Sequence, residues 1–157
     1  MSLTIIQNAE LPEVKKELQR MLTDGIRSPE VRAMAIEITQ YADDSISAIH
    51  DWIKANIPYV SDPAKRELFI APRRLLEMQQ QGIAGGDCDD LALLSASMLS
   101  SIGYETRLAL LDTGSGEFDH AIAQVKSENG WVNFDTSSIL PLGWHISYSR
   151  AIYIEPQ

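Results

Sequence analysis

Apolar residues recur at helical spacing through the first part of the chain. Leucine, valine and methionine at every third or fourth position predict a helix over residues 11–22. A second helix is predicted to follow, with Ser28 as its N-cap and Pro29 at its first position. Isoleucines at helical spacing predict a third helix, which ends near Asn56 because Pro58 disfavours helical geometry at the residue before it.

The pattern changes in the second half, where one apolar helix is followed by strands. Pro72 is predicted to begin a short helix through Gln81, whereas residues 57–71 show too little periodicity to assign. Residues 89–102 predict a helix that is buried on most sides and ends at Gly103. The strands are predicted at residues 104–112, 120–126 and 131–135, with a possible fourth at 150–154. This order predicts an α+β fold, with N-terminal helices and a central helix packed on an antiparallel sheet.

Length and charge narrow the class of protein. The 157 residues suit a single domain, with residues 1–44 as an N-terminal helical extension and 45–157 as the functional core. The net charge of −9 argues against binding to nucleic acid or to an anionic membrane surface. Two basic pairs, Lys65–Arg66 and Arg73–Arg74, form either a local basic patch or simply a solvated face.

The chain has one cysteine and no apolar run long enough to span a bilayer. One cysteine cannot form an internal disulfide, and the first residues lack the features of a secretory signal. A cytoplasmic location is therefore the expectation. The thiol itself needs an explanation, either as core packing or as chemistry.

Cys88 lies where a glycine-rich bend, Gly85-Gly86, enters the predicted buried helix. A helix N-terminus favours thiolate over thiol, and its backbone N–H groups can bind the oxyanion formed when a carbonyl is attacked. The neighbouring acids Asp87, Asp89 and Asp90 oppose a thiolate, so a nucleophilic Cys88 would need a positively charged partner.

His120 and Asp135 stand at the ends of two successive predicted strands. A four-residue connection over 127–130 would place Asp135 one diagonal step from His120 on the same sheet face. A tight turn at 129–130 would instead set Asp135 opposite Gln124, too far from His120. The first geometry would supply nucleophile, base and orienting carboxylate, the arrangement used for acyl transfer.

Each of these residues also has a plain structural interpretation. A lone cysteine in an apolar helix is usually core, a strand-initial histidine is usually a surface or turn residue, and Asp135 begins a turn-forming run. The acids beside Cys88 raise the alternative of a calcium site, although no EF-hand spacing is present. His50 and His145 lack a second ligand at zinc-like spacing.

Taken in order, these motifs resemble the transglutaminase-like superfamily, and more narrowly its small bacterial and phage-associated members. The similarity extends from about Ile46 to Trp144, and its main motifs are Gly85-Gly86-Asp87-Cys88-Asp89-Asp90-Leu91-Ala92, Gly103-Tyr104, Asp119-His120-Ala121 and Trp131-Val132-Asn133-Phe134-Asp135. In that family the cysteine starts the central helix, and the histidine and aspartate lie on neighbouring strands. The resemblance therefore implies a papain/transglutaminase-like core with Cys88, His120 and Asp135 as its triad.

The resemblance further implies a cysteine-dependent enzyme that acts on amide or peptide bonds of a protein or peptide through a thioester, without a cofactor or metal. Hydrolysis is favoured over crosslinking because no additional domain offers an acceptor site. Family members complete the oxyanion hole with an upstream side chain, for which Tyr59 is the candidate; a core tyrosine is the alternative. A second possibility is a non-catalytic binding or structural protein of the same fold, such as a phage assembly component, which would be virion-associated. The sequence does not indicate an oligomeric state.

Overall fold

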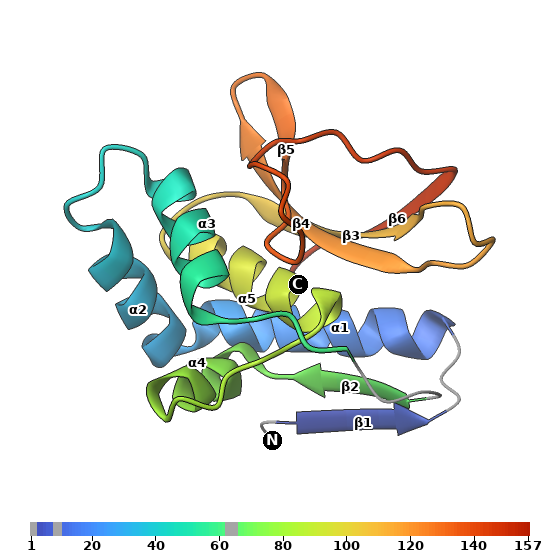
Figure 1. Ribbon diagram of the computed structural model, residues 1–157, viewed down its shortest axis with the longest axis horizontal. Coiled ribbons are helices and arrows are strands. Elements are labelled where there is room, and N and C mark those ends of the chain that lie inside the picture. Colours follow the sequence, from blue (N-terminus) through green and yellow to red (C-terminus); the bar gives the residue numbers. More distant parts are fainter. Residues whose placement is uncertain (1–2, 8–10, 62–65) are drawn as a thin grey trace.

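The computed structural model describes residues 3–7, 11–61 and 66–157, which form helices and two antiparallel sheets (Figure 1). The helices are α1 (Leu11–Arg27), α2 (Pro29–Thr39), α3 (Ser45–Asn56), α4 (Pro72–Gln80) and α5 (Cys88–Ser101). The strands are β1 (Leu3–Gln7), β2 (Arg66–Ile70), β3 (Thr106–Asp112), β4 (His120–Ser127), β5 (Gly130–Phe134) and β6 (Arg150–Ile154). The four-stranded sheet has the order β5-β4-β3-β6, and β1 pairs with β2. The predicted α+β fold is confirmed.

Helix α5 is the centre of the molecule. It lies between the four-stranded sheet and α1 (Figure 1), and all residues from Asp90 to Leu99 are buried. An apolar sequence with small residues among the leucines suits this position, because neighbours surround the helix on most sides. Its first residue, Cys88, therefore lies at the point where the central helix meets the sheet.

Helix α1 packs directly on α5 and contributes Leu18, Met21 and Leu22 to the core. It runs five residues beyond the predicted end at residue 22. Gly25 lies within this added turn, where a Cβ would collide with the side chain of Ser97 on α5. A glycine inside a helix is unfavourable by itself, so close contact between the two helices accounts for its presence.

The predicted helix boundaries are largely confirmed. The Ser28 hydroxyl accepts a hydrogen bond from the Val31 N–H at 3.3 Å, with Pro29 at the first position of α2. Helix α3 ends at Asn56, as the position of Pro58 predicted. Helix α5 begins at Cys88 and ends at Ser101, each one residue before the predicted position.

The interpretation of the first half as helical missed strands β1 and β2. They pair antiparallel from Leu3↔Ile70 to Gln7↔Arg66, so the paired residues lie far apart in the sequence. Strands of five residues contain too few alternations to stand out, and their pairing is non-local. Of the basic pairs, Arg73 and Arg74 each bridge to Glu77, at 3.6 and 3.4 Å. Lys65 lies outside the described residues.

The four-stranded sheet is covered on both faces. Leu108, Leu110 and Ala123 join the main core with α5. The alternate positions Ala109, Leu111 and Ile122 form a second small cluster, against which Ile146 and Ala151 pack. The segment between β5 and β6 therefore passes over the outer face, close to the strand ends that carry His120 and Asp135.

Candidate active site

The N-terminus of α5 is closed by a reciprocal capping box. The Asp87 carboxylate accepts from the Asp90 N–H at 3.2 Å, and the Asp90 carboxylate accepts from the Asp87 N–H at 3.1 Å. Asp90 also accepts from the Ile70 N–H at 2.8 Å, which ties β2 to the start of the helix. These acids therefore fix the backbone around Cys88.

The two glycines before the cap allow close packing within the protein. A Cβ at Gly85 would lie 2.6 Å from Val60 Cγ2, and one at Gly86 would lie 2.8 Å from the Asp90 Cβ. Gly86 also exchanges backbone hydrogen bonds with the segment around Tyr59: the Val60 N–H donates to the Gly86 carbonyl at 2.7 Å. The glycines thus bring residues 58–60 against the turn that leads to Cys88.

Cys88 is half-buried, and its surroundings oppose a thiolate. Burial raises the pKa of the thiol far above its ordinary value, and the charges of Asp89 and Asp87 raise it further. The nearby backbone N–H of Ala121, on β4, acts in the opposite direction and lowers the pKa. Cys88 therefore lies near the start of β4, where Ala121 follows His120, and the resting cysteine is a neutral thiol.

His120 and Asp135 are joined directly. His120 Nε2 donates to Asp135 Oδ2 at 2.9 Å, and both side chains are largely buried. Strand pairing explains the contact, because Lys126 pairs with Trp131 and the register places Asp135 diagonally from His120. This is the productive register of the two that the sequence left open. The other ring nitrogen of His120, Nδ1, takes no part in this bond.

The carboxylate of Asp135 is held on both oxygens. Its Oδ1 accepts from the backbone N–H of Ser137 at 2.9 Å and from the Ser137 hydroxyl at 2.6 Å. Burial works to raise the pKa of Asp135, but the hydrogen bonds from His120 and Ser137 outweigh it, so the pKa lies below its ordinary value. The residue is therefore an ionised carboxylate beside the imidazole.

Tyr59 is half-exposed, at 51% of its surface, rather than a core tyrosine. Its backbone bridges to Gly86, two residues before Cys88. An exposed phenol on a segment fixed next to the turn that leads to Cys88 is compatible with the oxyanion role expected from the sequence, which stays a prediction.

Two residues that contact Asp135 were not identified as site residues from the sequence. Ser137 binds the carboxylate, and His50 of α3 binds the Asp135 backbone carbonyl at 2.9 Å. A signal existed for His50, since it falls on the apolar stripe of α3 beside Ile49 and Ile53. A histidine in that position has to find a polar partner inside the protein.

Other site chemistry finds little support in the described residues. Over residues 3–7, 11–61 and 66–157, no group of three or more histidine, cysteine or acidic side chains is arranged to hold a metal ion. The acids that raised the possibility of calcium include Asp87 and Asp90, which serve as the helix cap. In the same part of the chain, no helix is long and apolar enough to cross a membrane.

Comparison with known proteins identifies the fold. A crystal structure of a candidate cysteine protease from Cytophaga hutchinsonii is 18% identical with a TM-score of 0.58, over 90% of this chain and 52% of that one. A candidate protease from Parabacteroides distasonis is 15% identical with a TM-score of 0.54, over 81% of this chain and 27% of that one. The chain thus spans about half of the first protein and about a quarter of the second.

A search of curated proteins finds no match. The family model of the transglutaminase-like superfamily, however, matches residues 31–136, which is more than half of the chain and includes Cys88, His120 and Asp135. The chain belongs to the transglutaminase-like superfamily.

Proposed function

We propose that this protein is a cysteine-dependent acyl-transfer enzyme that cleaves amide or peptide bonds through a thioester on Cys88. The observation that carries the proposal is the 2.9 Å hydrogen bond between His120 and Asp135, formed at the strand ends beside the start of α5. The inclusion of Cys88 is supported by its place at the first position of α5 and by the nearness of its thiol to the backbone N–H of Ala121, the residue after His120. Such a group of nucleophile, base and orienting acid is what acyl transfer requires.

The proposed reaction begins with the neutral thiol. As the Cys88 sulfur bonds to the carbonyl carbon, its proton passes to His120 Nδ1, and the imidazolium is stabilised by the ionised Asp135. The Cys88 N–H and the Tyr59 hydroxyl would bind the oxyanion. Collapse breaks the carbon–nitrogen bond, the leaving amine takes the proton from His120, and a thioester remains. Water activated by His120 then releases the acid and restores the thiol.

Hydrolysis is the proposed outcome in preference to amine transfer. The structural neighbours support this choice, because both are described as candidate proteases. The substrate would be a protein or peptide, since the bond broken is an amide. The same thioester would yield a new amide if an amine reached it before water.

A second candidate, a non-catalytic binding or structural protein of the same fold, is favoured by one observation. Burial and two adjacent acids make Cys88 a poor thiolate, which suits a cysteine that only fills space. The two candidates differ in whether the reactivity of the thiol depends on His120.

Alkylation of the single thiol by iodoacetamide, followed by intact mass, tests this dependence. We expect His120→Ala to lower the alkylation rate at pH 7 by about tenfold to hundredfold, part of what a positioned base contributes. His145→Ala is the matched control for the loss of a histidine, because the His145 side chain is exposed. An unchanged rate in His120→Ala would contradict the catalytic proposal and favour the non-catalytic one.

A pool of defined peptides with methylamine then separates hydrolysis from amine transfer. Hydrolysis gives new carboxyl ends, whereas amine transfer gives methylamide ends, and mass spectrometry distinguishes the two. Cys88→Ala, which lacks the nucleophile, should give neither product.

A further inference from the structure

His50 binds the backbone of the residue that orients the proposed base. Its ring lies on α3 and is almost fully buried, with 4% of its surface exposed. Nε2 lies 2.9 Å from the Asp135 carbonyl oxygen, so the ring donates to it, and the ring packs edge-on against Phe134 with centroids 5.0 Å apart. The histidine thus has a defined partner on each side and one orientation.

Asp135 needs such an anchor because the sheet does not hold it. The ladder between β4 and β5 ends with the pair Ala123↔Phe134, so Asp135 is the first residue beyond the strand. Its carboxylate is fixed by His120 and Ser137, but neither of these bonds fixes its peptide plane. The bond from His50 does so from the side of α3.

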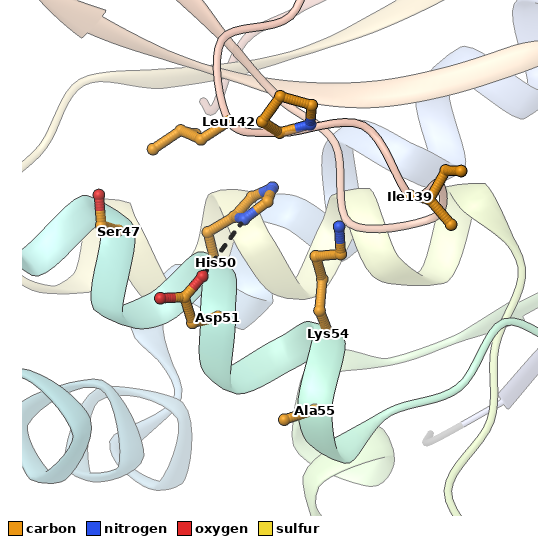
Figure 2. Close-up of a pocket in the computed structure, with 8 residues that line it drawn as sticks. Ser47, His50, Asp51, Lys54, Ala55, Ile139 and Leu142 are labelled. Carbon is orange, nitrogen blue, oxygen red and sulfur yellow. Dashed lines mark ion pairs between the residues drawn. The ribbon is translucent and has the colours of Figure 1, made fainter.

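Helix α3 is a firm support for this bond. Asp44 caps its N-terminus, and Ile49 and Ile53, on the same stripe as His50, are fully buried. The helix contacts the segment after β5 a second time, where the Lys54 ammonium approaches the Leu140 carbonyl at 3.4 Å. Figure 2 shows His50 and Lys54 rising from α3 toward the segment that carries Ile139 and Leu142.

We propose that His50 is a positioning residue, which fixes the Asp135 peptide so that the carboxylate meets His120 in the geometry that the reaction needs. The proposal rests on the proposed function and extends the site from the α5–sheet junction to α3. Its physical basis is that a small displacement of an orienting group is costly in rate even when the fold is unchanged.

The test compares His50→Leu with His50→Gln. Glutamine keeps an N–H donor near the position of Nε2, whereas leucine keeps the volume and removes the donor. We expect His50→Leu to lower the alkylation rate of Cys88 at pH 7 by about tenfold to hundredfold, and His50→Gln to restore most of it. If the leucine variant does not fold, His50→Asn replaces it, because its shorter side chain does not reach the carbonyl.

Two control variants separate positioning from general stability. Ile53→Val removes a methyl group from the buried face of the same helix without touching Asp135, so it should lower the melting temperature but not the rate. Asp51→Asn changes the exposed carboxylate that lies 4.0 Å from His50 Nδ1, on the side away from Asp135, and should change neither.

A second measurement reads the Asp135–His120 bond directly, whatever the activity. The NMR signal of the His120 Nε2 proton should be shifted downfield in the wild type and in His50→Gln, and should move or disappear in His50→Leu. An unchanged signal together with a rate equal to that of Ile53→Val would overturn the role of His50. An altered signal with no dependence of alkylation on His120 would support the positioning and contradict the proposed enzyme instead.

Discussion

The candidate site has a strand end, where His120 and Asp135 lie, and a helix end, where Cys88 begins α5. The strand end stabilises a negative charge, whereas the helix end opposes one. At the strand end, hydrogen bonds from His120 and Ser137 hold Asp135 as a carboxylate in spite of its burial. At the helix end, burial and the charges of Asp89 and Asp87 hold Cys88 as a thiol. The helix N-terminus alone would favour the thiolate, so burial and these two acids outweigh the helix dipole.

This difference determines when the proton moves. A resting thiolate–imidazolium pair would require a helix end that stabilises negative charge, whereas here burial and adjacent acids destabilise the thiolate. The proposed enzyme instead keeps its negative charge on Asp135 and transfers the thiol proton to His120 only as the sulfur attacks. The substrate, rather than the resting protein, would then complete the activation.

The largest effect on this comparison should come from removing the charge at the strand end. In Asp135→Asn the Ser137 hydroxyl and N–H keep an oxygen to bind, but the stabilisation of the imidazolium is lost. We expect the alkylation rate at pH 7 to fall about as far as in His120→Ala, by roughly tenfold to hundredfold. The alkylation rate is measured by quenching the iodoacetamide reaction at set times and determining the intact mass. A rate above one third of the wild-type rate would count against Asp135 as the orienting residue.

A steric change tests how firmly the helix end is built. In Gly86→Ala the new Cβ would meet the Asp90 Cβ at 2.8 Å, which is not the mobile end of a side chain, so the capping box has to shift. We expect a loss of about 1–3 kcal/mol in the free energy of unfolding, measured by urea denaturation.

Gly82→Ala is the control for the glycine effect alone. Gly82 has a φ of 76° but no heavy atom within 4 Å of the added Cβ, so it costs only backbone strain. Gly86 is not among the glycines with positive φ, so a Gly86→Ala variant as stable as wild type would show that the contact between Gly86 and Asp90 is unimportant.

The sequence predicted the α+β class and most of the helix ends from local patterns. The Gly-Gly-Asp-Cys bend and the apolar helix after it are such patterns, whereas Cys88, His120 and Asp135 were chosen as a triad through the family resemblance, and their catalytic roles stay a prediction. The register between β4 and β5 was left open because shifting one strand by two residues keeps every side chain on the same face of the sheet. In the structure, Lys126 pairs with Trp131, which decides the register. Tyr59 stays a prediction whose side-chain role the structure leaves untested.

What the sequence missed depends on contacts between distant segments. Strands β1 and β2 pair across the whole N-terminal half, and five residues of each carry no distinctive period. The bond from His50 to Asp135 spans 85 residues. In both cases the local sequence shows only that a residue prefers to be buried or paired, and the fold supplies the partner.

A smaller effect should follow from relieving the repulsion at the helix end. Asp89 is the charge that raises the pKa of Cys88 most, after burial, and unlike Asp87 it does not cap α5. Asp89→Asn should therefore lower the pKa of the thiol and raise the alkylation rate at pH 7 by about threefold, since an interaction with a partly exposed charge is worth about 1 kcal/mol or less. Glu128→Gln, an exposed acid in the β4–β5 turn, is the control, and a rate that falls in Asp89→Asn would contradict the assigned sign.

The smallest expected effect is on stability, at opposite ends of the pH scale. The pKa of Asp135 is lower in the folded protein than in the unfolded chain, so its contribution is present above about pH 4 and is lost as pH falls through the folded value. The pKa of Cys88 is raised in the folded protein, so above about pH 8.5 the unfolded chain loses a proton that the folded one keeps, and stability falls as pH rises. Asp135→Asn should flatten the acid limb of melting temperature against pH, and Cys88→Ala the alkaline limb. If Asp135→Asn flattened only the alkaline limb, or Cys88→Ala only the acid limb, the two ends of the site would not hold charge in the ways that their contacts indicate.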